Sequence, residues 1–136
     1  MIRFIFSLPQ WVRVLFCILY LSVIAGLSLM PSDDVPQLEM FQGFDKVVHG
    51  SMYFGLTILA GWTLHAENKR IRIVYVVLFS VLWGLLMEIS QLEMMLGRAF
   101  EWKDELANST GSLLGAVTYL LIARYNRYHK RLVYRR

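Results

Sequence analysis

Polar residues at helical spacing stand out in this otherwise apolar chain. Asp45, His49 and Tyr53 follow one another at intervals of four residues, so they share one face of a helix. Glu88 and Gln91 are three residues apart in a later apolar stretch and are helix neighbours in the same way. Histidine titrates near neutral pH, and a nearby carboxylate can orient its ring, a pairing suited to proton transfer. We therefore take His49, Glu88 and Asp45 as candidate catalytic residues.

A third polar cluster follows toward the C-terminus. Arg98 presents a planar fork that suits a phosphate or a carboxylate. Asp104 and Asn108 are four residues apart, and Asp104 could instead cap the helix that starts there. Gly111 and Gly115 form a pair of small residues that predicts close helix packing. The candidate ligand-binding residues are Lys46, Tyr53, Gln91, Arg98, Asp104 and Asn108.

Each of these residues also has a structural interpretation. His49 could simply hydrogen-bond Asp45 or Glu88 and hold two helices together, and Glu88 could form a salt bridge with a nearby cation. A mixed nitrogen and oxygen metal site from His49, Asp45, Glu88 and Asp104 is a further alternative. No compact ligand motif supports such a site, so we predict neither a metal nor a cofactor. Both the structural and the functional interpretations stay open at this point.

The polar clusters lie at the ends of apolar stretches long enough to cross a membrane. The chain has 136 residues, 57% hydrophobic and 18% charged, which would leave apolar surface facing water in a soluble domain. The sequence predicts an all-α polytopic membrane protein, a single domain with four transmembrane helices in an antiparallel bundle. The predicted spans are residues 11–30, 47–64, 71–91 and 106–123, each about 18–21 residues long, followed by a basic tail over 124–136.

Two further expectations concern the first span. Arg13 lies near its start, where the guanidinium is expected to extend to the membrane interface. A cleaved signal peptide is the alternative interpretation of this segment. The apolar run continues past Ala25, where a cleavage region should turn polar, so we favour a retained helix.

The distribution of basic residues predicts the orientation. Eleven lysine and arginine residues fall on the side of the two termini and the second loop, and three fall on the other side. The positive-inside rule then places both termini in the cytoplasm. Basic residues gathered at span ends indicate contact with anionic lipid rather than nucleic acid. All three polar clusters reach the outer leaflet, where facing lipid costs a few kcal/mol, so we expect them to face one another.

Taken together, the motifs resemble those of the VanZ-like membrane proteins, a family named for a teicoplanin-resistance protein. The resemblance covers Asp45 to Gly115 and rests on Asp45-Lys46-x-x-His49-x-x-x-Tyr53, Gly84-x-x-x-Glu88-x-x-Gln91, and Arg98 followed by Asp104-x-x-x-Asn108-x-x-Gly111-x-x-x-Gly115. One departure is Glu101, where many relatives carry a small hydroxyl residue. The resemblance implies a four-helix protein of the bacterial envelope, linked in some members to glycopeptide resistance, but it implies no reaction.

Two hypotheses for function follow. In the first, the outer-leaflet cavity recognises, and in a stronger form acts on, an anionic lipid or a lipid-linked envelope precursor. Lys46 and Arg98 would hold the anion, while His49 would move a proton. In the second, the chain is a non-enzymatic accessory or transport subunit whose polar cluster stabilises the bundle or a partner interface. Four spans are few for a transporter, so this second hypothesis predicts a homo-oligomer.

Overall fold

The chain folds into helices throughout the part that the computed structural model describes, which is residues 2–31, 41–65, 73–94 and 101–133. These residues form α1 (Ile2–Ser7), α2 (Gln10–Ser28), α3 (Phe44–Thr63), α4 (Ile73–Glu93) and α5 (Trp102–Val133), and no strand occurs among them. Among the described residues, three helices are long and apolar enough to cross a membrane: α2, α4 and the Trp102–His129 part of α5. The predictions of an all-α chain and a membrane protein are therefore confirmed.

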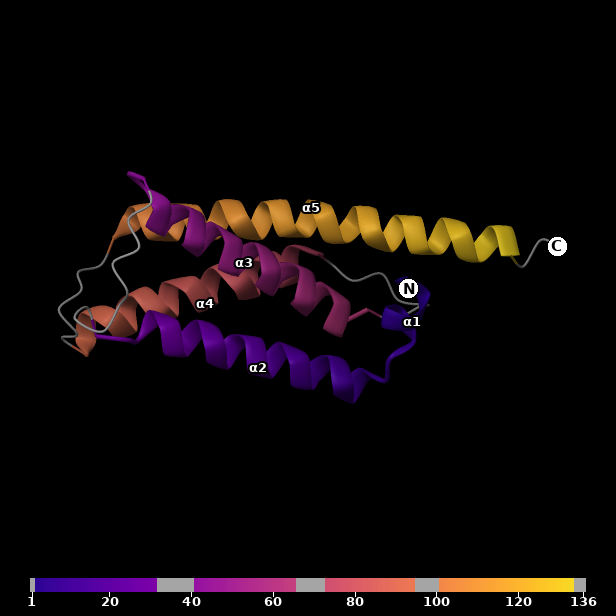
Figure 1. The fold of residues 1–136 in the computed structure, drawn as a ribbon, viewed down its shortest axis with the longest axis horizontal. Helices are drawn as coiled ribbons and strands as arrows, with labels where there is room; N and C mark the ends of the chain where they lie inside the picture. Colours follow the sequence, from indigo (N-terminus) through magenta and orange to yellow (C-terminus); the bar gives the residue numbers. More distant parts are fainter. Residues whose placement is uncertain (1, 32–40, 66–72, 95–100, 134–136) are drawn as a thin grey trace.

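The four long helices lie side by side, and each runs opposite to the one before it (Figure 1). α3 packs against α2, α4 and α5, and its contact with α5 is the most extensive in the molecule. The residues that α3 buries include Tyr53, Leu56, Thr57 and Ala60. α3, which holds most of the predicted span 47–64, is long enough to cross a membrane but is less apolar than α2, α4 and the Trp102–His129 part of α5. A helix covered on several sides by other helices needs few apolar side chains for lipid.

α5 is longer than hydropathy indicates. α5 begins at Trp102 and continues to Val133, so much of the basic tail is helical. A helix satisfies its own backbone hydrogen bonds in water as well as in lipid, so the loss of apolar residues after Ala123 does not end it. At about 48 Å, α5 exceeds a hydrocarbon core of roughly 30 Å.

The short α1 lies near the start of the chain, and its Phe6 packs against Trp62 and Tyr119.

Glycines set the crossing of α3 and α5. A Cβ added at Gly111 would press on the carbonyl group of Gly50, only 2.8 Å from its carbon, and one at Gly115 would lie 2.5 Å from the carbonyl oxygen of Phe54. Real Cβ atoms essentially never approach other atoms more closely than 3.0 Å, so neither site has room for a larger residue. The two backbones therefore touch, as the small-residue spacing predicts.

The opposite end of the bundle is fastened by Arg13. Its side chain is only 8% exposed, and Nη1 donates hydrogen bonds to the carbonyl oxygens of Trp62 and His65, both at 2.8 Å. The guanidinium that was expected to extend to the membrane interface is therefore bonded to the end of α3. The carbonyl groups that end α3 have no partner within the helix, and a cation satisfies both their hydrogen bonds and the helix dipole.

Candidate functional site

Side chains from three helices converge where α3 and α5 begin and α4 ends (Figure 1). We call the group of Asp45, Lys46, His49, Glu88, Glu101 and Asp104 the polar cluster. α3 carries the first three of these residues and α4 carries Glu88. Asp104 lies in the first turn of α5, and Glu101 lies just before it. The antiparallel arrangement brings these helix ends together, although the residues are up to 59 positions apart in the sequence.

Lys46 lies at the centre of the ion pairs. Its ammonium nitrogen is 2.7 Å from Asp45 Oδ2 and also contacts carboxylate oxygens of Glu101 and Asp104. The hydrogen bond from Lys46 lowers the pKa of Asp45 below its usual value. Burial disfavours the charged ammonium, but the hydrogen bonds to Asp104, Asp45 and Glu101 outweigh this cost and raise the pKa of Lys46. Lys46 is therefore a fixed positive charge.

His49 is held in one tautomer by the backbone. Its Nδ1 lies 3.1 Å from the carbonyl oxygen of Asp45, and a carbonyl oxygen can only accept a hydrogen bond. In the neutral ring Nδ1 therefore carries the proton, and Nε2 keeps its lone pair. Nδ1 is also 3.6 Å from Asp104 Oδ1, and the imidazole is only 12% exposed. This arrangement leaves Nε2 able to accept a proton or bind a cation.

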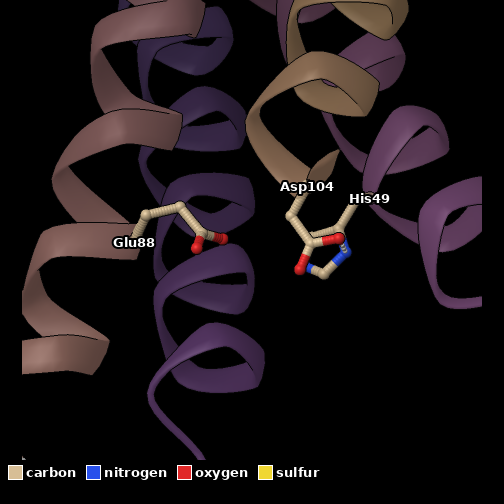
Figure 2. A group of neighbouring side chains, drawn as sticks. All are labelled: His49, Glu88 and Asp104. Carbon is tan, nitrogen blue, oxygen red and sulfur yellow. Dashed lines mark ion pairs between the residues drawn. The ribbon is translucent and has the colours of Figure 1, made fainter. Parts of the chain in front are cut away.

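Glu88 approaches the same point from α4. Glu88 is 2% exposed, and its Oε2 accepts a hydrogen bond of 3.3 Å from the backbone N–H of Glu101, which lies just before α5. The start of a helix favours a negative charge, because its N–H groups and dipole point toward it. Figure 2 shows Glu88, Asp104 and His49 turned toward one another, and one ligand atom of each lies within 4.8 Å of the other two.

A second layer of polar groups lies one helical turn deeper. Tyr53, Asn108 and Glu105 surround Gly84, where an added Cβ would be 3.2 Å from the Tyr53 ring and 2.9 Å from Glu105 Oε2. Asn108 Nδ2 donates to Glu105 Oε2 at 3.4 Å. Tyr53 and Asn108 are each 1% exposed, yet the Tyr53 hydroxyl and Asn108 Oδ1 have no hydrogen-bond partner among the described residues. Buried polar atoms without partners commonly mark a bound water or ion.

An apolar groove of about 680 Å³ runs between α3 and α5 beside the polar cluster. Lys46 and Lys103, both in the first turn of their helices, lie at one end of it. Its walls continue along Val47, Phe54, Leu106 and Leu114. The groove therefore joins two lysine side chains at one end to apolar walls beyond.

Comparison with protein families assigns the chain. The family model described as VanZ/LLP1 matches residues 4–123, which is most of the 136-residue chain. The chain belongs to the VanZ/LLP1 family. The match includes all of the polar cluster, so the resemblance drawn from the motifs is confirmed, and the chain is a VanZ-like envelope protein. No curated protein and no solved structure matches this VanZ/LLP1 sequence.

Not every residue expected at the site of this VanZ/LLP1 protein lies in the polar cluster. Gln91 turns toward α2 instead, where Nε2 donates a hydrogen bond of 2.7 Å to the carbonyl oxygen of Ser28. It therefore satisfies the end of α2, because the last carbonyl groups of a helix lack internal partners. Arg98 lies outside the described residues, so its expected role stays a prediction. Lys46 lies both in the cluster and on the groove wall.

Sequence reasoning missed three residues of the site. Glu101 pairs with Lys46 through its side chain and with Glu88 through its N–H group. Glu105 accepts the hydrogen bond of Asn108, and Ser112 is fully buried one turn further along α5. The signal was present in the spacing, because Glu101, Glu105, Asn108 and Ser112 recur every three or four residues.

Proposed function

We propose that this protein recognises an anionic lipid or a lipid-linked envelope precursor at the outer leaflet of the bacterial inner membrane. In this proposal the apolar tail lies in the groove between α3 and α5, and the anionic headgroup lies at the end of the groove beside Lys46 and Lys103. In the stronger form of the proposal, His49 with Glu88 or Asp45 exchanges a proton with the headgroup. Altered susceptibility to teicoplanin-type glycopeptides would follow from withholding or changing such a precursor.

The position of Lys46 carries this proposal. Its ammonium group pairs with three carboxylates of the cluster, and the same residue lines the apolar groove. A ligand with a charged head and a long apolar tail could contact Lys46 and the apolar groove at the same time. Lys103 at the same end of the groove adds a second positive charge for a phosphate.

The proposal requires four membrane crossings with both termini in the cytoplasm. The alternating direction of α2 to α5 and the excess of basic residues near both termini support this topology (Figure 1). Cys17 is the only cysteine and is buried, so introduced cysteines can be labelled selectively. The variants are Phe4→Cys before α2, Glu93→Cys at the end of α4 and Tyr128→Cys late in α5, all exposed positions.

A membrane-impermeant maleimide applied to spheroplasts should label Glu93→Cys alone. The other two variants should react only after the membrane is permeabilised. If α3 does not cross, the Phe4 and Tyr128 positions lie on opposite sides of the membrane, and one of them reacts in sealed spheroplasts. An inverted four-helix topology would label both Phe4→Cys and Tyr128→Cys and protect Glu93→Cys.

Native mass spectrometry of the purified protein tests lipid recognition. Lys46→Gln removes the shared charge, and Thr110→Phe fills the groove without changing charge. Arg124→Gln and Leu113→Phe are the matched controls, because both residues are exposed on α5 and neither lines the groove. We expect an anionic lipid or prenyl-phosphate species on the wild type and on both controls. Lys46→Gln and Thr110→Phe should both lose it.

The same comparison separates recognition from the accessory alternative. Melting temperatures of all variants are measured first, so that loss of lipid is not confused with loss of fold. Equal retention of mixed lipids by every folded variant would refute the proposal. The polar cluster would then be assigned to holding the helices or a partner together.

A further inference from the structure

The geometry points to a divalent-cation site formed by His49, Glu88 and Asp104 between α3, α4 and α5 (Figure 2). One ligand atom from each residue lies within 4.8 Å of the others, so a small movement brings all three to a common metal ion. An imidazole nitrogen with two carboxylate oxygens suits borderline ions such as Mn²⁺ or Zn²⁺. The residues come from three helices, which is why no compact sequence motif indicated them. The site goes beyond lipid recognition and does not depend on it.

Lys46 distinguishes this group from a second set of carboxylates. Asp45, Glu101 and Asp104 also lie close enough together to hold a cation. The chain supplies that cation itself, because the ammonium group of Lys46 contacts all three. A metal at the His49 group would share Asp104 with Lys46, and a carboxylate has a second oxygen for this purpose.

Buried negative charge at this point favours an added cation. Glu88 is 2% exposed and Asp104 is 7% exposed, and both turn toward His49. Lys46 contacts Asp104, but its ammonium group is shared with Asp45 and Glu101, whose side chains are more than half exposed. A buried carboxylate requires compensation by a cation or by hydrogen bonds.

The tautomer of His49 fits a metal ligand. Metal-binding histidines usually donate their other N–H group to a backbone carbonyl or a carboxylate, which fixes the ring. Nδ1 of His49 has this partner in the Asp45 carbonyl oxygen, 3.1 Å away. Nε2 is then the nitrogen whose lone pair is available to the ion.

Two unpartnered oxygens give an independent reason to place a hydrated ion here. The Tyr53 hydroxyl and Asn108 Oδ1 are buried without hydrogen-bond partners among the residues that the structure describes. Tyr53 lies one turn from His49 on α3, and Asn108 lies one turn from Asp104 on α5. Both side chains pack against Gly84, one turn from Glu88 on α4. An ion with three protein ligands keeps water in its remaining positions, and such water can bond to both oxygens.

Titration of the detergent-solubilised full chain with MnCl₂ tests the site. Free Mn²⁺ gives an electron paramagnetic resonance spectrum that disappears on binding, so its loss counts bound ions. We expect one Mn²⁺ per wild-type chain, displaced by Zn²⁺. Glu88→Gln and His49→Gln should each weaken binding by at least about 100-fold, because each removes a direct ligand.

Two control variants separate this site from unspecific attraction. Glu93→Gln removes an exposed carboxylate from the same end of α4, and His129→Gln removes a histidine from the far end of α5. Both should keep the wild-type affinity. No binding by the folded wild type, or equal affinity in all four variants, would overturn the site. Added Mn²⁺ should also raise the melting temperature of the wild type but not of Glu88→Gln, and equal rises in both would count against it. Lipid retention is measured separately, so either proposal can fail alone.

Discussion

Replacing Gly111 by alanine should loosen the contact between α3 and α5 more than any other single-methyl change in the described helices. The added Cβ would press on the backbone carbonyl group of Gly50, 2.8 Å from its carbon. A backbone group cannot rotate away as a side chain does, so the helices must move apart by about 1 Å to restore ordinary contact. Every groove and cluster contact between these helices depends on that spacing.

The expected cost is about 1–3 kcal/mol or more, the range for adding a methyl group to a fully packed site. Gly26→Ala on α2 is the matched control, because an added Cβ there has no atom within 4 Å. Helices persist when a membrane protein unfolds in detergent, so the higher helix propensity of alanine contributes little. The control should therefore stay within about 0.5 kcal/mol of the wild type.

The assay is thermal or denaturant unfolding in one detergent, followed by intrinsic tryptophan fluorescence. Gly50→Ala provides an intermediate case, because its Cβ would lie 3.4 Å from the carbonyl oxygen of Ala107. The order of stability should be Gly26→Ala, then Gly50→Ala, then Gly111→Ala. Equal stability of Gly26→Ala and Gly111→Ala would refute the close crossing of α3 and α5.

Three further predictions concern other parts of the molecule. Arg13→Leu should lower the free energy of unfolding by about 2–4 kcal/mol, because it removes the two charged hydrogen bonds that Arg13 donates to the carbonyl oxygens of Trp62 and His65. An unchanged unfolding curve in detergent would contradict this. Tyr53→Phe should change stability by less than about 0.5 kcal/mol when a chelator is present, because its hydroxyl has no hydrogen-bond partner among the described residues; a marked loss on unfolding with the chelator present would show that the hydroxyl already has a partner. The pKa of Asp45 is lowered by Lys46, so the stability it contributes is fully present above its unfolded pKa of about 4 and is lost as the pH falls through the lower folded value. Its side chain is 59% exposed, so Asp45→Asn should cost less than about 1 kcal/mol at pH 7 and progressively less as the pH falls below about 4. A gap in melting temperature that widens with acid would refute this.

Much of the fold follows from the sequence because lipid imposes simple requirements. Apolar stretches of spanning length must be helical, and short connections make neighbouring helices antiparallel. The same reasoning predicted that His49, Glu88 and Asp104 would reach one depth, and the structure brings them together. Hydropathy could not predict the end of α5, since a helix that leaves the membrane needs no apolar residues.

The partners within the site could not be read from the sequence. Spacing gives the depth of a side chain, but its neighbours depend on the rotation of each helix about its axis. The approach of Gly111 to Gly50 fixes that rotation for α3 and α5, and no hydropathy pattern encodes it. Hence Gln91, a helix neighbour of Glu88, turns to Ser28, while Glu101 joins the cluster from a position before α5.

The low hydropathy of α3 and the presence of the site have a common cause. A helix in contact with α2, α4 and α5 presents little surface to lipid, so polar side chains on it carry no penalty for facing hydrocarbon. The stripe of Asp45, His49 and Tyr53 is continued one turn deeper by Thr57, whose hydroxyl donates to Ser80 at 2.9 Å. In a lipid-facing helix each of these groups would favour leaving the membrane. Covering α3 with other helices is therefore what allows the chain to hold titratable groups within a bundle of apolar helices.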